Sequence, residues 1–399
     1  MTGTADQACW NEALYGGNDT LLRKLVDKEP PAISLVQLAG HINGLYRRRD
    51  LMPWTGADRE LRTQIARATT LVDEIRSKLG AEEQRRIDLA FLRFVRHSSC
   101  LSVVIGAWAS KAAGGPLWGE LVEELVKFTL KKDVSPHIDR QARQVLARIG
   151  TGKAIFEDLT HGAQLLDEFW GQHVFTHMYG LLYNSAPKPG PIHEAIAELA
   201  KLQAVPDRRS LKAPGWGRII TYNYDDLMGE ALDACGLPRA AWAMRGGKVK
   251  GDPNQFAIDD STWHVPILHL HGYTPRKLFR LTQVQFVFST AQYEKVYGGV
   301  RVGILKRAFE ECLANPIDIA LYVGCSFTDD YMNDLLREAA EFLPGRRHFA
   351  LLQWPGSGDP LGSTPGERAR HEARYQRFGV QPIWFREFKE IPELILSLA

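Results

Sequence analysis

Apolar side chains recur every three or four positions in the first part of the chain. Residues 57–80 show this spacing and predict an amphipathic helix that ends at Gly80, a residue suited to a helix C-terminus. Residues 82–97 predict a second helix. The pattern therefore indicates an N-terminal helical region over about 1–97, which we expect to serve oligomerisation or partner binding.

Beyond residue 98, short apolar runs rich in β-branched residues alternate with helical periodicity. Between the first run and the second, over about 131–204, only helical patterns occur. Alternating strands and helices predict an α/β fold, a doubly wound Rossmann-like parallel sheet, here with a helical insertion. Ligands of such folds bind at the carboxyl ends of the strands. The expected strands cover 100–106, 218–224, 265–272, 317–327, 348–354 and 380–385.

Composition narrows the class of protein. The 399 residues include 49 Lys and Arg against 47 Asp and Glu, and this balance argues against a dedicated nucleic-acid binder. No apolar run approaches the roughly 18–20 residues that span a bilayer, and no signal-peptide pattern opens the sequence, so we expect a cytoplasmic protein. The five cysteines are scattered without a CxxC pair, which indicates neither a zinc site nor a disulfide framework.

Residues with useful chemistry follow the first three predicted strands. The turn Gly106–Ser110 could bring backbone amides close to a phosphate, although a glycine there often serves only a tight turn. Asn223 could orient a sugar hydroxyl or a water, or it could cap the next helix. His271 is placed to act as a general base, but a strand histidine is more often a core residue. With His269 it could also bind a metal, for which no third ligand is evident.

The fourth predicted strand ends in small residues, Gly324 and Ser326, which allow close approach of the backbone. Asp329 or Asp330 is a candidate cap of the following helix.

Three further patterns do not fit the motifs that they resemble. Residues 150–154 look like a phosphate-binding loop, but neither the first glycine nor the final Ser or Thr is present. His173 and His177 have the spacing of zinc proteases without the glutamate. Residues 245–251 form a basic, glycine-rich hairpin candidate, which we interpret as a solvated loop tip rather than a partner contact.

Taken in order, the strand ends resemble the sirtuin-like (silent information regulator) family of NAD-consuming proteins, and its bacterial antiphage-defence branch in particular. The resemblance covers about 98–390 and includes the segment 281–297. The family elements are Gly-Ala-Gly-x-Ser, Gly-x-Pro-x-Trp, Thr-x-Asn-Tyr-Asp, Leu-His-Gly and Gly-x-Ser-Phe-x-Asp. They are matched here by 106–110, 114–118, 221–225, 270–272 and 324–329.

This resemblance implies roles for individual residues. His271 falls on the catalytic histidine, and Asn223 on the asparagine that holds the nicotinamide ribose and the attacking water. The helical insertion resembles a module that covers one side of the cleft in these proteins. The residues expected to bind NAD+ are Gly106, Ala107, Ser110, Asp225, Gly324 and Ser326.

Two departures from the family pattern refine the expected activity. Protein-deacylating sirtuins carry a four-cysteine zinc ribbon, and its absence here favours an NAD+ hydrolase, with no zinc, over an NAD-dependent deacylase. Trp108 replaces the second glycine of the phosphate-binding turn, and an indole cannot copy the close approach that glycine permits. It could narrow the cleft, act as a gate, or abolish NAD+ binding. The alternative is therefore a catalytically silent nucleotide-binding or scaffold subunit.

The resemblance also implies a biological role. NAD+ would be a substrate, cleaved to nicotinamide and ADP-ribose, and its depletion would stop an infected bacterial cell. Residues 98–399 would form the sirtuin-like catalytic domain. A homo-oligomer is expected, and the resemblance makes an ATPase or DNA translocase a possible partner. Such a partner would be a separate chain, because no ATPase motif occurs in this one.

Overall fold

The computed structural model describes most of the chain from residue 79 onward and scattered pieces before it. The described residues are 9–10, 12–13, 19–28, 34, 37–38, 41, 63–64, 67–68, 70–72, 74–75, 79–98, 100–131, 140–151, 155–203, 216–245, 248–250, 265–274, 276, 287–289, 292, 318–329, 332–337, 348–355 and 363–398. Asp330, residues 152–154, the tip of the 245–251 segment, most of 281–297 and parts of the expected helix 57–80 lie outside them.

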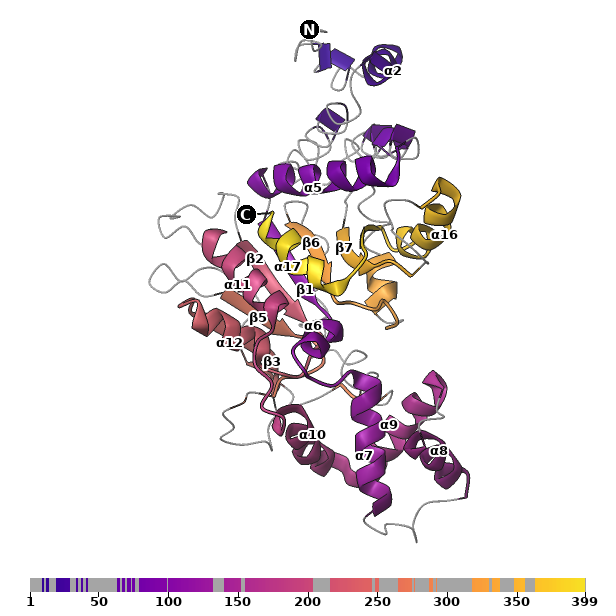
Figure 1. Ribbon diagram of the computed structural model, residues 1–399, viewed down its shortest axis with the longest axis vertical. Helices are drawn as coiled ribbons and strands as arrows, with labels where there is room; N and C mark the ends of the chain where they lie inside the picture. The colour runs from indigo at the N-terminus through magenta and orange to yellow at the C-terminus, as the bar shows by residue number, and fades with distance from the viewer. Residues whose placement is uncertain are drawn as a thin grey trace.

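The strands form one eight-stranded sheet in the order β4-β3-β5-β2-β1-β6-β7-β8. Each neighbouring pair is parallel except β3 and β4, so the predicted doubly wound α/β fold is confirmed (Figure 1). All six expected strands are present. The bounds are β1 Cys100–Ile105, β2 Trp216–Thr221, β3 Arg239–Arg245, β4 Lys248–Lys250, β5 Val265–His269, β6 Asp318–Val323, β7 His348–Gln353 and β8 Val380–Phe385.

Two strands were not expected individually. β3 reads RAAWAMR, which has no β-branched residue and is rich in the helix formers Ala and Met, so its composition hides the strand. β4 pairs with it antiparallel, with Arg245 opposite Lys248. β3 and β4 are therefore paired as the two strands of a hairpin, as the glycines and basic residues of 245–251 indicated, and the tip between them lies outside the described residues.

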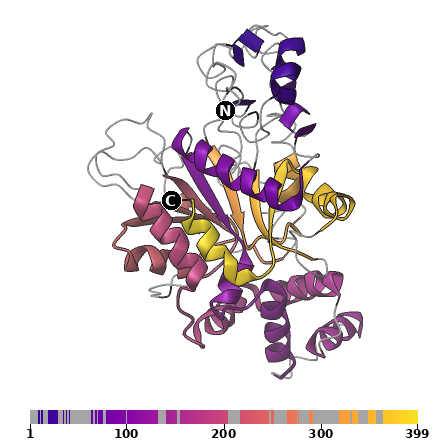
Figure 2. The same ribbon diagram turned by 45° about the horizontal axis from the view of Figure 1, so that its top comes forward.

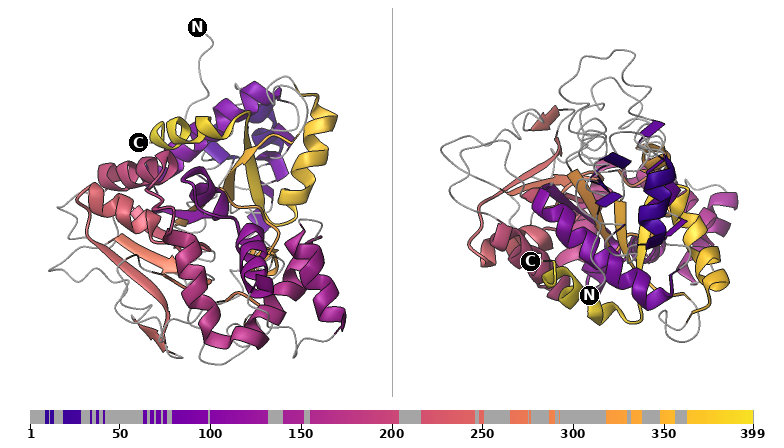
Figure 3. Two further views of the ribbon diagram at one scale, coloured as in Figure 1. Left: turned by 60° about the horizontal axis from the view of Figure 1, so that its bottom comes forward. Right: turned by 90° about the horizontal axis from the view of Figure 1, so that it is seen from above.

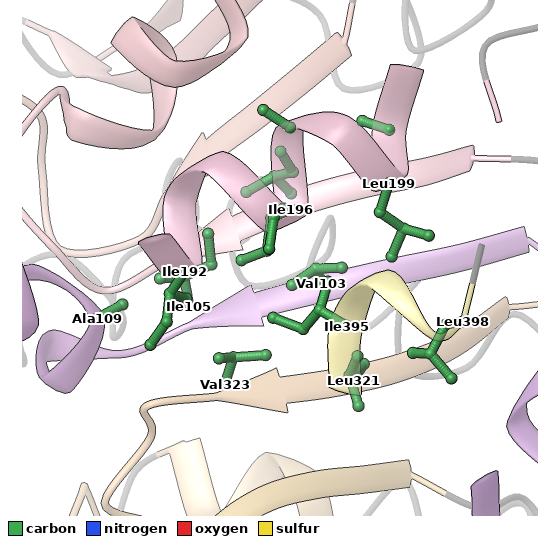
Figure 4. Close-up of a cluster of buried hydrophobic side chains, with 14 of the residues drawn as sticks. Val103, Ile105, Ala109, Ile192, Ile196, Leu199, Leu321, Val323, Ile395 and Leu398 are labelled. Atoms are coloured by element: carbon green, nitrogen blue, oxygen red, sulfur yellow. The ribbon is translucent and has the colours of Figure 1, made fainter. Parts of the chain in front are cut away.

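Both faces of the sheet are buried at β1, β6 and β7, which explains why these strands are almost continuously apolar. In β1, Val103 and Ile105 face one core and Val104 faces the other. The first core is covered by α11 (Pro191–Gln203) and α17 (Ile391–Leu396), as Figure 4 shows. These two helices lie side by side across that face (Figure 2).

A helical module lies beside the carboxyl ends of the central strands (Figure 1). It has its own apolar core, which also takes in Tyr224 and Phe288. The module differs at both ends from the expected insertion 131–204. The last helix of that range, α11, packs on the sheet, whereas α7, which comes before the range, packs in the module. The module helices are α7 (Trp118–Lys131), α8 (Arg140–Gly150), α9 (Phe156–Trp170) and α10 (Val174–Tyr183).

The N-terminal helices lie at the opposite end of the sheet. α5 (Ala81–Ser98) leads directly into β1, and α2 (Asp19–Lys28) lies beyond it (Figure 1; Figure 3, right). A separate cluster of buried side chains from residues 9–79, including Trp10 and Leu22, forms a further core that takes in α2, whereas Leu92 of α5 packs in the first core of the sheet. None of the described helices is long and apolar enough to cross a membrane.

Candidate functional site

The candidate residues gather where the chain reverses direction across the sheet. From β1 the chain continues to β2 on one side and returns later to β6 on the other side. Such a switch point opens a crevice at the carboxyl ends of the strands. Gly106 directly follows β1, and Gly324 directly follows β6. Asn223 comes two positions after the end of β2, and His271 comes two positions after the end of the adjacent β5.

Gly106 and Gly324 allow two turns to pack backbone against backbone. The Gly106 N–H donates to Val323 O at 2.9 Å. A Cβ atom on Gly106 would lie 2.3 Å from Gly324 O, and Gly324 has a φ of +69° that favours glycine. Both glycines are therefore needed for the contact between the ends of β1 and β6.

The turn after β1 leads into the short helix α6 (Ala107–Ala112), which Ala107 opens. Several of its amides bond within the protein: Trp108 N donates to Gly324 O at 3.2 Å, and Ala109 N donates to Gly106 O at 3.1 Å. The Trp108 indole lies at the surface, 47% exposed, with its ring 6.2 Å from the Phe388 ring. Its side chain therefore lies against the segment before α17.

A buried hydrogen-bond network fixes the Asn223 side chain. Its Nδ2 donates to Ser110 Oγ at 2.7 Å and to Gly106 O at 3.2 Å. Ser110 Oγ in turn donates to Asp225 Oδ2 at 2.7 Å. Three of the sequence-predicted site residues and the Gly106 carbonyl are thus joined, and Ser110 serves here to hold Asn223.

Asp225 completes this network at the start of α12 (Leu227–Ala234). Its Oδ1 accepts a hydrogen bond from Leu227 N at 3.1 Å, so Asp225, rather than Asn223, bonds the helix start. Burial raises the pKa of the Asp225 carboxyl, and the hydrogen bond from Ser110 opposes that increase.

The other half of the Asn223 amide lacks a partner. Because a carbonyl oxygen only accepts hydrogen bonds, Gly106 O requires the Asn223 Nδ2 group to face it, and this sets the orientation of the amide. Asn223 Oδ1 is then a buried acceptor with no hydrogen bond within the described part of the chain. A buried acceptor of this kind costs about 1–3 kcal/mol unless a ligand or water satisfies it.

His271 follows β5, the strand that pairs with β2, and Asn223 follows β2. Thr221 of β2 pairs with His269 of β5, and each candidate residue stands two positions further along its chain. His271 Nε2 lies 3.3 Å from Asp329 Oδ2, with side chains 12% and 27% exposed. The His271 ring centroid is 5.2 Å from that of Tyr222. The His271 side chain is thus partly exposed at the carboxyl ends of the strands.

His269 has a different environment from His271. It is buried, its Nδ1 lies 3.3 Å from Asn223 O, and its ring packs 4.2 Å from the Tyr273 ring. It therefore supports the backbone of Asn223. In the part of the chain that the structure describes, no three His, Cys, Asp or Glu side chains are grouped to hold a metal ion.

Ser326 lies apart from the Asn223 network. It is exposed, and its Oγ lies 2.8 Å from Thr328 Oγ1. The same segment brings in a contact that the sequence did not indicate, between Asp329 and His271. Only the position of Asp329 after a strand hinted at proximity to the site.

Tyr183, at the end of α10, is a second residue that the sequence did not indicate. Its hydroxyl donates to Thr274 O and accepts from Asp226 N at 2.9 Å. Thr274 N donates to Tyr224 O at 2.7 Å. The module is thereby bonded to the segments that follow Asn223 and His271.

The fold defines a doubly wound α/β protein whose candidate residues lie at the carboxyl ends of its parallel strands, where ligands of such folds bind. Comparison with protein families then identifies it: residues 217–383 match the family model of the SIR2-like domain, so this part of the chain is a sirtuin-like domain. The match includes Asn223, His271 and Ser326. Such a domain is compatible with an NAD-utilising enzyme. No curated protein matches the chain significantly.

Proposed function

We propose that this protein is an NAD+ glycohydrolase that cleaves NAD+ to nicotinamide and ADP-ribose. The observation that carries the proposal is the buried, unsatisfied Oδ1 of Asn223, held at the switch point of a SIR2-like fold beside His271. An acceptor kept in this way suits a ribose hydroxyl or a water molecule.

The chemistry needs little acid assistance, because the nicotinamide ring of NAD+ is already positively charged. The bond between its nitrogen and ribose C1′ breaks, the electron pair stays with the ring, and neutral nicotinamide leaves. A water oxygen bonds to C1′ and loses one proton. The protein must therefore orient the ribose and the water and accept that proton.

Asn223 and His271 would divide these tasks. Asn223 Oδ1 would accept a hydrogen bond from the water or a ribose hydroxyl, and neutral His271 would take the proton. The contacts of Asn223 with Ser110 and Gly106 hold its amide before any substrate arrives. An amide fixed in advance loses no orientational freedom on binding, which favours the transition state.

The biological part of the proposal rests on the resemblance in the sequence. We propose an NAD-depleting effector of bacterial antiviral defence, located in the cytoplasm and acting as a homo-oligomer. A separate ATPase or DNA translocase is the proposed kind of partner. The described N-terminal helices α2 and α5 lie at the end of the sheet opposite the candidate site.

The direct test is to incubate purified protein with NAD+ and to quantify nicotinamide and ADP-ribose by chromatography. We expect Asn223→Ala and His271→Ala to abolish release while circular dichroism stays unchanged. Asn184→Ala and His161→Ala remove the same side chains at exposed positions and should behave as wild type. Wild-type rates in either site variant would contradict the assignment, and release that depends on an acetylated peptide would indicate a deacylase.

A second candidate function is a silent nucleotide-binding subunit. It is favoured by Trp108, which replaces the second glycine of the family's phosphate-binding turn and whose amide N–H is bonded to Gly324 O at 3.2 Å within the protein. If the wild type releases no nicotinamide and Trp108→Gly does, this candidate replaces the hydrolase. If both turn over, Trp108 is tolerated in the turn.

A further inference from the structure

His271 and Asp329 make contact across the carboxyl ends of two intervening strands. His271 follows β5 and Asp329 follows β6, and β2 and β1 lie between these strands in the sheet. Their side chains nevertheless meet, with Nε2 and Oδ2 3.3 Å apart. The contact must therefore pass over the carboxyl ends of β2 and β1, where Asn223 and Gly106 lie.

Asp329 is itself held by the protein backbone. Its Oδ1 accepts a hydrogen bond from Met332 N at 3.1 Å, and its carbonyl accepts one from Asn333 N at 2.9 Å, at the start of the helical residues 332–337. Asn333 Nδ2 also donates to Phe327 O at 3.0 Å. With one carboxylate oxygen anchored to the helix, the position of the other oxygen is set by the fold.

We propose that Asp329 is a positioning residue for His271, an inference that rests on the proposed NAD+ hydrolysis. An ionised carboxylate only accepts hydrogen bonds, so it would bind the tautomer that carries its hydrogen on Nε2. Nδ1 is then the ring atom that takes the proton from the attacking water. The nearby negative charge stabilises the imidazolium that forms until the proton passes to solvent.

The competing explanation is that Asp329 only caps the helix that follows it. Asp329→Asn separates the two roles, because asparagine caps helices as well as aspartate does. Its amide can keep the acceptor for Met332 N. Toward His271, however, it removes the charge and can present an N–H donor, which favours the other tautomer.

The first experiment compares turnover of NAD+ by the wild type and Asp329→Asn. We expect kcat to fall by up to about 10⁴-fold, the effect of replacing the carboxylate that orients a catalytic histidine, and KM to change less than about threefold. Asp334→Asn removes an exposed carboxylate of the same helix, paired with Arg337, and serves as the matched control. An Asp329→Asn enzyme with wild-type kcat would overturn the proposal.

The second experiment reads the tautomer without needing activity. Long-range ¹H–¹⁵N spectra of histidine side chains distinguish the two tautomers, and the His271 signals are assigned by their loss in His271→Gln. We expect the Nε2–H form in the wild type and a shift toward the Nδ1–H form in Asp329→Asn. An unchanged tautomer would show that Asp329 is only a cap. If the wild type cleaves no NAD+, the proposed function fails, whereas this spectrum still decides whether Asp329 holds the ring.

Discussion

The side-chain amide of Asn223 has both a structural role and a proposed catalytic role. One half bonds to Ser110 and Gly106, and the other half is a buried acceptor that the described residues leave unsatisfied. Such an atom lowers stability unless a ligand or a water molecule supplies a hydrogen bond to it, which is why the proposed function places the substrate there. Asp225 adds to the same cost, since burial raises the pKa of its carboxyl.

His193 supports the fold in a way that depends on pH. It is buried in α11, where its Nδ1 accepts a hydrogen bond from Gly190 N at 3.2 Å. Burial lowers the pKa of His193 from 6.5 to about 4. As the pH falls, the His193 side chain therefore takes up a proton near pH 6.5 in the unfolded chain but only near pH 4 in the folded protein. The stability that neutral His193 contributes is complete above pH 6.5 and is lost as the pH falls toward 4.

We predict that this residue makes the protein about 2 kcal/mol less stable at pH 5 than at pH 7, by linkage between protonation and folding. Glutamine keeps a hydrogen-bond acceptor but does not titrate. Urea unfolding at both pH values should therefore show a smaller loss, by about 2 kcal/mol, for His193→Gln than for the wild type. Equal losses in the two proteins would mean that His193 does not titrate differently on unfolding.

Among the elements, the turns that follow β1 and β6 pack backbone against backbone beside the site. A Cβ on Gly106 would lie 2.3 Å from Gly324 O, whereas a Cβ on Gly366, in α16 (Pro365–Gln376), meets nothing within 4 Å. Gly106→Ala should therefore lower the free energy of unfolding by about 1–3 kcal/mol. Gly366→Ala should be neutral or slightly stabilising. Denaturant unfolding measures both, and a neutral Gly106→Ala would refute this packing.

The helical module is coupled to His271 through a short segment. Asp167 of α9 accepts hydrogen bonds from Ser289 Oγ at 2.9 Å and Gln292 Nε2 at 2.7 Å. In the same segment, Val287 N donates to His271 O at 2.8 Å. The module is therefore connected to the backbone of His271 by hydrogen bonds through this segment.

We predict that Asp167→Ala lowers kcat/KM for NAD+ by roughly tenfold, equivalent to about 1.4 kcal/mol, because the segment loses its support. Glu168→Ala is the control, since this exposed neighbour bonds only within its own helix, to Gln164, among the contacts described. Steady-state kinetics of nicotinamide release give the values. If the two variants behave alike, the module does not act through Asp167.

For the whole molecule, the sequence was informative where burial leaves a local pattern. Strands buried on both faces show continuous apolar runs, and six were predicted in this way. Because parallel strands end at one edge, the approach of Asn223 and His271 could also be predicted. β3 lacks β-branched residues and was not recognised. The contact of Asp329 with His271 depends on the order of the strands in the sheet, which no local pattern encodes.

The shape of the molecule separates its regions. The module lies beside the carboxyl ends of the strands, and the N-terminal helices lie at the other end (Figure 1; Figure 3). Arg368 of α16, a helix that packs on β8, donates to Leu79 O at 2.8 Å and so bonds the sheet domain to the end of the N-terminal segment.

The central claim is that the site around Asn223 and His271 hydrolyses NAD+. Its most direct test is the rate of nicotinamide release from NAD+ by the purified wild-type protein and by Asn223→Ala, measured side by side. The account predicts release with an equal amount of ADP-ribose from the wild type and none from the variant. Equal release from both proteins would contradict it.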